Sequence, residues 1–97
     1  MSTTKAEQKM ARLAYAFSDP LRIEIVAILR KEKSVCNCEF QSKLGLSQSK
    51  ASYHLKILVD SGVVARDVRG TWSYYSIVES KSVDKIWGAL EASTAGR

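Results

Sequence analysis

Two cysteines separated by a single residue, Cys36 and Cys38, have the clearest capacity in this sequence to bind a ligand. Thiolates select soft ions, which predicts arsenite, cadmium or another soft metal ion as the bound species and excludes magnesium or calcium. Residues two apart point about 200° away from each other on a helix but share a face in an extended segment. A metal or metalloid site therefore requires residues 35–39 to be extended or to unwind.

Other interpretations of the pair stay open. The thiols could form a redox pair that a thiol-reactive signal oxidises, or two small buried hydrophobes in a DNA-binding regulator without an effector. A small cytosolic protein that handles metal or redox equivalents is a further alternative. Because the pair falls at the predicted start of a helix, we expect its thiols to ionise more readily than free cysteine. No obligatory cofactor is predicted.

A helix with one polar side follows the cysteines. The segment Ser47–Gly62, SQSKASYHLKILVDSG, opens with a capping serine and closes with a glycine. Its apolar residues gather on one side of the helical wheel, and hydroxyls, an amide, a phenol and lysines gather on the other. Such a surface can enter a DNA major groove, and a solvated helix face is the alternative. The predicted DNA contacts on this helix are Gln48, Ser49, Ser52, Tyr53 and Lys56.

Beyond Gly62 the pattern changes to that of strands. Residues 63–68 and 71–78 are rich in Val, Tyr, Trp and Ile and are separated by an Arg-Gly turn, which predicts a β-hairpin. Arg66 and Arg69 lie near its tip, where a guanidinium can reach phosphates or the minor groove. A solvated hairpin tip is the alternative. The aromatic residues of the hairpin are expected to pack rather than to stack on bases.

The other segments show helical periodicity and helix boundaries. Asp19 is suited to cap a helix that Pro20 begins, and Asn37 is the expected N-cap of a short third helix. The turn between that third helix and the polar one has only about three residues, as in a helix-turn-helix. These features predict a mainly α fold with a small β-hairpin, in one domain over residues 1–97. The predicted helices besides the polar one are residues 5–17, 21–31, 35–44 and 80–92.

Two apolar stripes exceed what a domain of this size usually exposes. We expect them to pair across a two-fold homodimer interface, with segments 1–17 and 80–93 as dimerisation helices. The alternative is that the last helix closes the core of its own chain. The predicted interface residues are Met10, Leu13, Phe17, Val83, Ile86, Trp87 and Leu90.

Composition narrows the function further. The net charge is +5 for 97 residues, which favours an anionic partner such as nucleic acid. We find no nucleophile–base pattern and no phosphate-binding loop, so an enzyme is not expected. No apolar run is long enough to span a membrane, and no signal peptide is recognisable, which predicts a cytoplasmic protein. His54 is expected to be packed or to touch a phosphate, since no second histidine exists to share a metal.

The order of elements resembles the ArsR/SmtB family of winged helix-turn-helix repressors over residues 10–90. The resemblance implies a homodimer that represses a palindromic double-stranded DNA operator until an effector releases it. The arsenic and cadmium sensors of this family generally use three or four thiolates, and this chain supplies two. The third ligand here would therefore be water, a small thiol, Glu39 or the partner subunit. Tyr53 stands where many members carry another histidine, which leaves the operator sequence open. The matching segments are SDPLRIEIVAIL at the second helix, LGLSQSKASYHLKILVDSGVV at the recognition helix, RGTWSYYSI at the wing, and SVCNCEF, which is similar to the family's Cys-x-Cys-Asp box with Glu39 in place of Asp.

Overall fold

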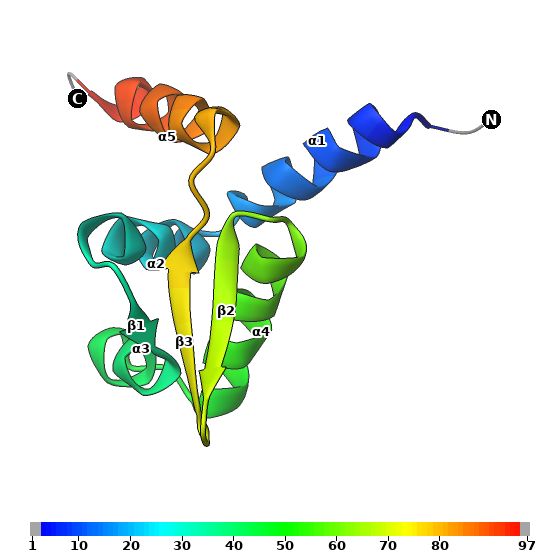
Figure 1. The fold of residues 1–97 in the computed structure, drawn as a ribbon. Helices are drawn as coiled ribbons and strands as arrows, with labels where there is room; N and C mark the ends of the chain where they lie inside the picture. Colours follow the sequence, from blue (N-terminus) through cyan, green and yellow to red (C-terminus); the bar gives the residue numbers. More distant parts are fainter. Residues whose placement is uncertain (1–2, 96–97) are drawn as a thin grey trace.

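The computed structural model describes residues 3–95, which form helices and short strands in the order expected for a winged helix-turn-helix (Figure 1). The strands form one antiparallel sheet in the order β1-β3-β2. Helices α1 and α5 leave the body at the end opposite the hairpin tip and diverge from each other (Figure 1). The elements are α1 (Lys5–Ala16), α2 (Pro20–Lys31), β1 (Val35–Cys36), α3 (Asn37–Leu44), α4 (Gln48–Asp60), β2 (Val64–Arg69), β3 (Trp72–Ile77) and α5 (Lys81–Thr94).

The predicted helix boundaries around α2 and α4 are confirmed. The Asp19 carboxylate accepts from the Leu21 N–H at 2.8 Å, and Pro20 is the first helical residue. The Ser47 hydroxyl accepts from the N–H of the third residue of α4 at 3.2 Å. Gly62 takes the left-handed conformation, with φ of +82°, just after α4 ends, which lets the chain turn directly into β2.

The third helix begins later than predicted. Val35 and Cys36 form β1, which pairs with β3 through Val35–Tyr75 and Cys36–Tyr74. Cys36 rather than Asn37 is the N-cap of α3, because its Sγ accepts from the backbone of the second helical residue. The predicted two-stranded hairpin is therefore part of a three-stranded sheet.

The core lies between the sheet and helices α2, α3 and α4. Phe40 is fully buried and packs edge-on against Tyr75, with ring centroids 6.5 Å apart. Val83 of α5 also belongs to this core, at 2% exposure. Within residues 3–95, no helix has the length and apolar character that crossing a membrane requires.

Candidate nucleic-acid interface and adjoining thiol pair

Helix α4 has one buried side and one exposed side. Ala51, Leu55 and Leu58 are completely buried against the rest of the domain. All five side chains predicted to contact DNA from this helix are exposed. The polar surface is therefore available to a partner and is not consumed by the fold.

A groove of about 570 Å³ runs between α4 and the hairpin. Gln48, Ser52 and Lys56 follow each other at four-residue intervals and line it from α4. Arg66 lines it from β2, and Cys38 lines it from α3. The fold thus brings four of the predicted DNA contacts to one concave surface that also contains a thiol.

The other two predicted contacts of α4, Ser49 and Tyr53, lie outside this groove. Tyr53 is 56% exposed, and its ring meets the edge of the neighbouring His54 ring with centroids 5.1 Å apart. The neighbouring Tyr15 side chain of α1, followed by partial burial, raises the pKa of Tyr53. The phenol therefore stays protonated at neutral pH and can act as a donor.

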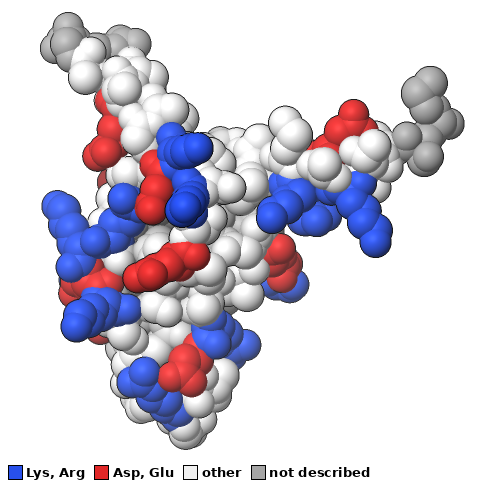
Figure 2. Space-filling model, turned by 45° about the horizontal axis from the view of Figure 1, so that its top comes forward, with Lys and Arg blue, Asp and Glu red and all other residues white. Residues whose placement is uncertain are grey.

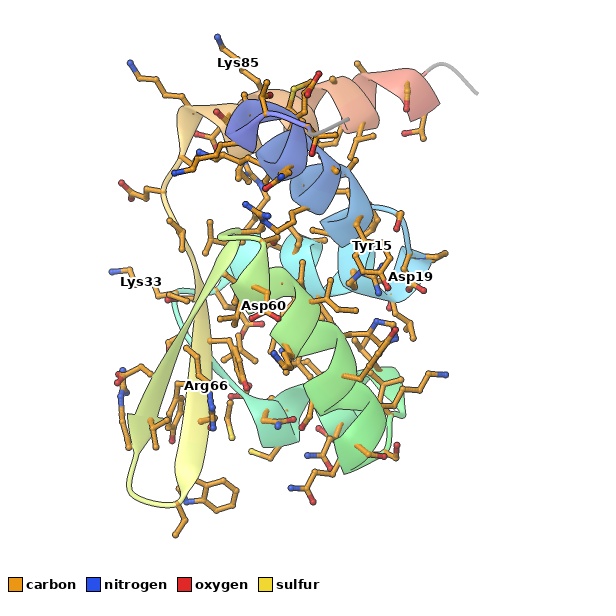
Figure 3. All side chains as sticks on the ribbon, turned by 90° about the vertical axis from the view of Figure 1, so that its right-hand side faces the viewer. Tyr15, Asp19, Lys33, Asp60, Arg66 and Lys85 are labelled. Atoms are coloured by element: carbon orange, nitrogen blue, oxygen red, sulfur yellow. The ribbon has the colours of Figure 1, made fainter. Side chains whose placement is uncertain are left out.

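The two hairpin arginines lie on opposite faces of the sheet. Arg66 donates twice to the Ser73 hydroxyl, at 2.9 and 3.0 Å, on the face that looks toward α4 (Figure 3). Arg69 is three residues further along the strand, so its side chain points the other way. It pairs with Asp67 at 2.8 Å and stacks over the Tyr74 ring at 4.7 Å. Only Arg66 shares the groove with α4.

The two cysteines sit together at the start of α3, one buried and one exposed. Cys36 is 4% exposed, and its Sγ accepts from the Cys38 N–H at 3.3 Å. The Glu39 carboxylate accepts from the Cys36 N–H at 3.3 Å. Residues 35–36 are extended, as a shared ligand requires, whereas Cys38 lies in the first turn of α3. Glu39, however, is engaged as a cap.

The ionisation expected for the pair is wrong for Cys38. A hydrogen bond with the Cys36 side chain, partial burial, and the charges of Cys36 and Glu39 together raise the pKa of the Cys38 thiol above its usual value. Proximity to a second thiol therefore outweighs the helix dipole here. Among residues 3–95, no cluster of three or more His, Cys, Asp or Glu side chains is placed to hold a metal ion. The two soft donors suit a soft ion.

The residue between the cysteines contacts the recognition helix. Asn37 Nδ2 donates to the Ser52 hydroxyl of α4 at 3.4 Å, while its Oδ1 accepts from Gln41 at 3.3 Å. Sequence reasoning treated Asn37 only as a cap. Its place between the two candidate thiol ligands was the available signal that it belongs to this region.

A second polar link to α4 comes from a buried arginine that sequence reasoning did not single out. Arg22 of α2 is 3% exposed, and its Nη1 lies 2.9 Å from His54 Nδ1. His54 is 5% exposed, so the expectation of a packed histidine is confirmed. The signal was a charged side chain inside an otherwise apolar segment, since such a residue is buried only when it is fully hydrogen-bonded.

The predicted dimerisation stripes lie at the end of the molecule opposite the hairpin tip. Met10 is 67% exposed and Leu90 is 37% exposed. Phe17 and Trp87 already contact each other within one chain, with ring centroids 6.5 Å apart. The prediction that Val83 lies at the dimer interface is wrong, because Val83 faces the core of its own chain and is not available to a partner. Leu13 and Ile86 are half-buried.

A mostly apolar cavity of about 640 Å³ lies between the α1–α2 corner and α5. Three acidic residues, Asp19, Glu24 and Glu91, contribute to its lining. Basic side chains gather along one side of α1 (Figure 2), and its first turn contains the acidic Glu7. The exposed end of the molecule therefore combines an acidic-lined apolar hollow with a basic helix that carries an exposed methionine.

The fold and the exposed polar helix with its adjoining hairpin define a winged helix-turn-helix DNA-binding transcriptional regulator, which is not an enzyme. The family described as "Bacterial regulatory protein, arsR family" matches residues 19–66. The chain is 38% identical to the arsenical resistance operon repressor of Bacillus subtilis (strain 168), over 79% of this chain and 75% of the relative. The chain belongs to the ArsR family of repressors, which confirms the resemblance noted from its sequence.

Solved structures agree with this fold. NolR from Sinorhizobium fredii is 30% identical, has a TM-score of 0.79 and covers 100% of this chain and 99% of its own. The homodimeric winged helix-turn-helix DNA-binding domain of Mb0332 from Mycobacterium bovis is 23% identical, with a TM-score of 0.78 over 95% of this chain and 85% of its own. At that identity the second likeness supports the fold alone.

Proposed function

We propose that this protein is a homodimeric repressor that binds a palindromic operator in the cytoplasm and is released when a soft metal or metalloid binds Cys36 and Cys38. The observation that carries the proposal is that Cys38 lines the same groove as Gln48, Ser52 and Arg66. The thiol site and the DNA-contacting surface are contiguous. A structural change at the thiols would therefore act directly on the side chains proposed to contact DNA.

DNA recognition divides between two sets of side chains. Gln48 and Tyr53 carry the donors and acceptors that read base edges, with Ser49 and Ser52 beside them. Lys56 and Arg66 carry the positive charges that meet phosphates on the two sides of the groove. In the free protein Lys56 pairs with Asp60 at 2.9 Å, an exposed pair that contributes little to stability and exchanges readily for a phosphate.

Dimerisation follows from the apolar end of the molecule. The exposed Met10 and the basic side of α1 complement the acidic-lined hollow between α2 and α5 of a second chain. The Mb0332 domain, which has the same fold, is itself a homodimer. Two α4 helices would then enter successive major grooves, about 34 Å apart.

Release begins with the loss of a helix cap. To place both thiols on one ion, Cys38 must leave its helical position, which breaks the hydrogen bond that Cys36 Sγ accepts from the Cys38 N–H. The first turn of α3 then loses its N-cap, and Asn37 is drawn away from Ser52 of α4. The third ligand is water, a small thiol, a donor of the partner subunit or Glu39, whose hydrogen bond to the Cys36 N–H belongs to the same first turn.

The proposal is tested with DNA upstream of the protein's own gene, by fluorescence anisotropy. We expect a salt-dependent complex that arsenite or cadmium dissociates, and a Cys36→Ser/Cys38→Ser variant that binds this DNA equally well but is not released. Ser42→Ala, on the exposed side of α3, is the matched control and should respond as the unaltered protein does. Release of the double variant by arsenite would place the effector site elsewhere.

Oxidation of the pair is the second candidate function, favoured by the exposure of Cys38 beside a buried thiol. A peroxide titration of the same complex separates the two. Release by peroxide, reversed by a dithiol and without response to arsenite or cadmium, identifies a redox regulator. A complex that responds to neither treatment is that of a regulator without an effector at this site.

A further inference from the structure

Arg22 ties three parts of the chain together from a buried position. Its Nε donates to the Ala16 carbonyl at 3.1 Å, and its Nη2 donates to the Tyr15 carbonyl at 2.9 Å. Its guanidinium also lies over the Tyr15 ring, 4.8 Å from the centroid. The last turn of α1 contains no basic residue, so Arg22 supplies from α2 the positive charge that satisfies the carbonyls at that helix end.

The same guanidinium reaches the recognition helix. Arg22 Nη1 lies 2.9 Å from His54 Nδ1 in the middle of α4. In residues 3–95, side-chain hydrogen bonds from other helices reach α4 at two points, this one and Asn37–Ser52. One bond lies beside the thiols, and the other lies at the corner of α1 and α2, where Tyr15 and Asp19 sit next to α4 (Figure 3).

Arginine has donors only, so His54 Nδ1 must be the acceptor and must carry no proton. The imidazole is then neutral, with its proton on Nε2. We propose that Arg22 and His54 are positioning residues that hold the recognition helix at a fixed angle to the dimerisation helix α1, and that this link exists only while His54 is neutral. The proposal rests on the DNA binding proposed above, because it concerns how the DNA-contacting helix is oriented.

The surroundings of His54 agree with a neutral ring. Burial lowers the pKa of His54 below its usual value, the Asp19 carboxylate acts in the opposite direction, and the charges of Arg22 and Lys50 lower it further. Tyr53 touches the ring edge, and Tyr15 lies beyond it. Protonation would remove the acceptor and place an imidazolium against the guanidinium. The link is therefore present above the ordinary histidine pKa and is lost as the pH falls through the lowered pKa in the folded protein.

The consequence for DNA binding is geometric. Tyr53 precedes His54 on α4, and the Tyr15 side chain of α1 lies near it. Loss of the Arg22–His54 bond frees α4 to turn relative to α1. In a dimer held together through α1, this changes the orientation of both recognition helices on the operator, while contacts with phosphates alone tolerate the change.

The test uses the fact that His54 is the only histidine in the chain. We compare the full-length protein with His54→Asn, whose amide oxygen can take the acceptor position of Nδ1 without titrating, and with His54→Leu, which has no acceptor. At pH 8, His54→Leu should bind the operator about tenfold more weakly than the unaltered protein, about the effect of one charge-assisted hydrogen bond, while non-operator DNA is bound equally. His54→Asn should retain most of the operator affinity.

The pH profile separates positioning from simple stabilisation. Operator affinity of the unaltered, reduced protein should fall as the pH is lowered below the ordinary histidine pKa of about 6.5, and that of His54→Asn should stay level. Thermal melting at each pH shows whether the variants remain folded. An unaltered pH dependence in His54→Asn, or equal operator and non-operator losses in folded His54→Leu, overturns the proposal.

Nuclear magnetic resonance of the free protein keeps this inference distinct from the proposed function. The nitrogen shifts of His54 at pH 7.5 should show a protonated Nε2 and an unprotonated Nδ1, and the Tyr15 and Tyr53 ring signals should shift with the same midpoint as His54. A protonated Nδ1 at pH 7.5 overturns the link whether or not DNA binds. The expected tautomer in a protein that binds no upstream DNA would leave the link in place and reject only the proposed function.

Discussion

The two ends of the molecule differ in what one chain completes by itself. Around the hairpin, every wall of the groove comes from a single chain, and the lining is largely polar. Between α1 and α5, the lining is mostly apolar, and Met10 and Leu90 remain exposed. A polar surface is stable in water until DNA arrives, whereas an apolar one favours burial by another protein. Under the proposed function, one chain builds the DNA-contacting surface and the second chain sets its spacing.

The largest effect is expected from substitutions confined to the apolar end of the molecule. Met10→Glu combined with Leu90→Glu should give a folded monomer, because both side chains are exposed in the single chain. Operator affinity should fall about a hundredfold or more, as is usual when two linked binding events become one. Sedimentation at micromolar concentration and anisotropy with operator DNA measure the two consequences.

The matched control places the same charge elsewhere on the helix. Lys81→Glu, on an exposed position in the first turn of α5, should leave the protein dimeric. A dimeric Met10→Glu/Leu90→Glu variant would move the interface away from this end of the molecule.

A second pair of substitutions compares two residues within the groove. Gln48→Ala should remove discrimination between bases at one operator position, worth about 1–3 kcal/mol. Lys56→Ala should weaken binding to every DNA sequence and reduce the slope of affinity against salt by about one. Competition binding with single-base operator variants at several salt concentrations distinguishes these effects. Identical profiles for the two variants would contradict the division of roles.

The smallest expected effect compares the two faces of the hairpin. Arg66→Ala should cost a few-fold in affinity, on the scale of one phosphate contact, because Arg66 faces α4 across the groove. Arg69→Ala should cost less, because Arg69 is held on the other face by Asp67 and Tyr74. Neither change should lower the melting temperature appreciably, since both side chains are exposed. A greater loss of affinity in Arg69→Ala would assign the DNA side of the hairpin to the opposite face.

Much of this architecture could be predicted from the sequence because its boundaries depend on local chemistry. Asp19 with Pro20, and Ser47 with Gly62, fix helix ends through hydrogen bonds and backbone angles that involve only near neighbours. That Arg66 and Arg69 lie on opposite faces of the hairpin could also be predicted from the sequence, because residues three apart on a strand point to different sides.

The missed features depend on partners far along the chain. Strand β1 has two residues, too few for any periodicity, and exists because Val35 and Cys36 meet β3. The burial of Arg22 depends on carbonyls of α1 and on His54 of α4. The placement of Val83 in the core could not be separated from the dimer stripe by helical spacing, since both lie on one apolar side of α5.

Strand β1 also determines when, during synthesis, the sheet that supports the recognition helix can form. Because Val35 pairs with Tyr75 and Cys36 with Tyr74, the strand closes a loop that encloses all of α3 and α4. Such a contact between distant residues forms only after the intervening chain exists, and its closure slows folding relative to local helix formation. A nascent chain that ends before β3 therefore holds the recognition helix without the sheet that supports it, and β3 must be synthesised before the DNA-binding surface can assemble.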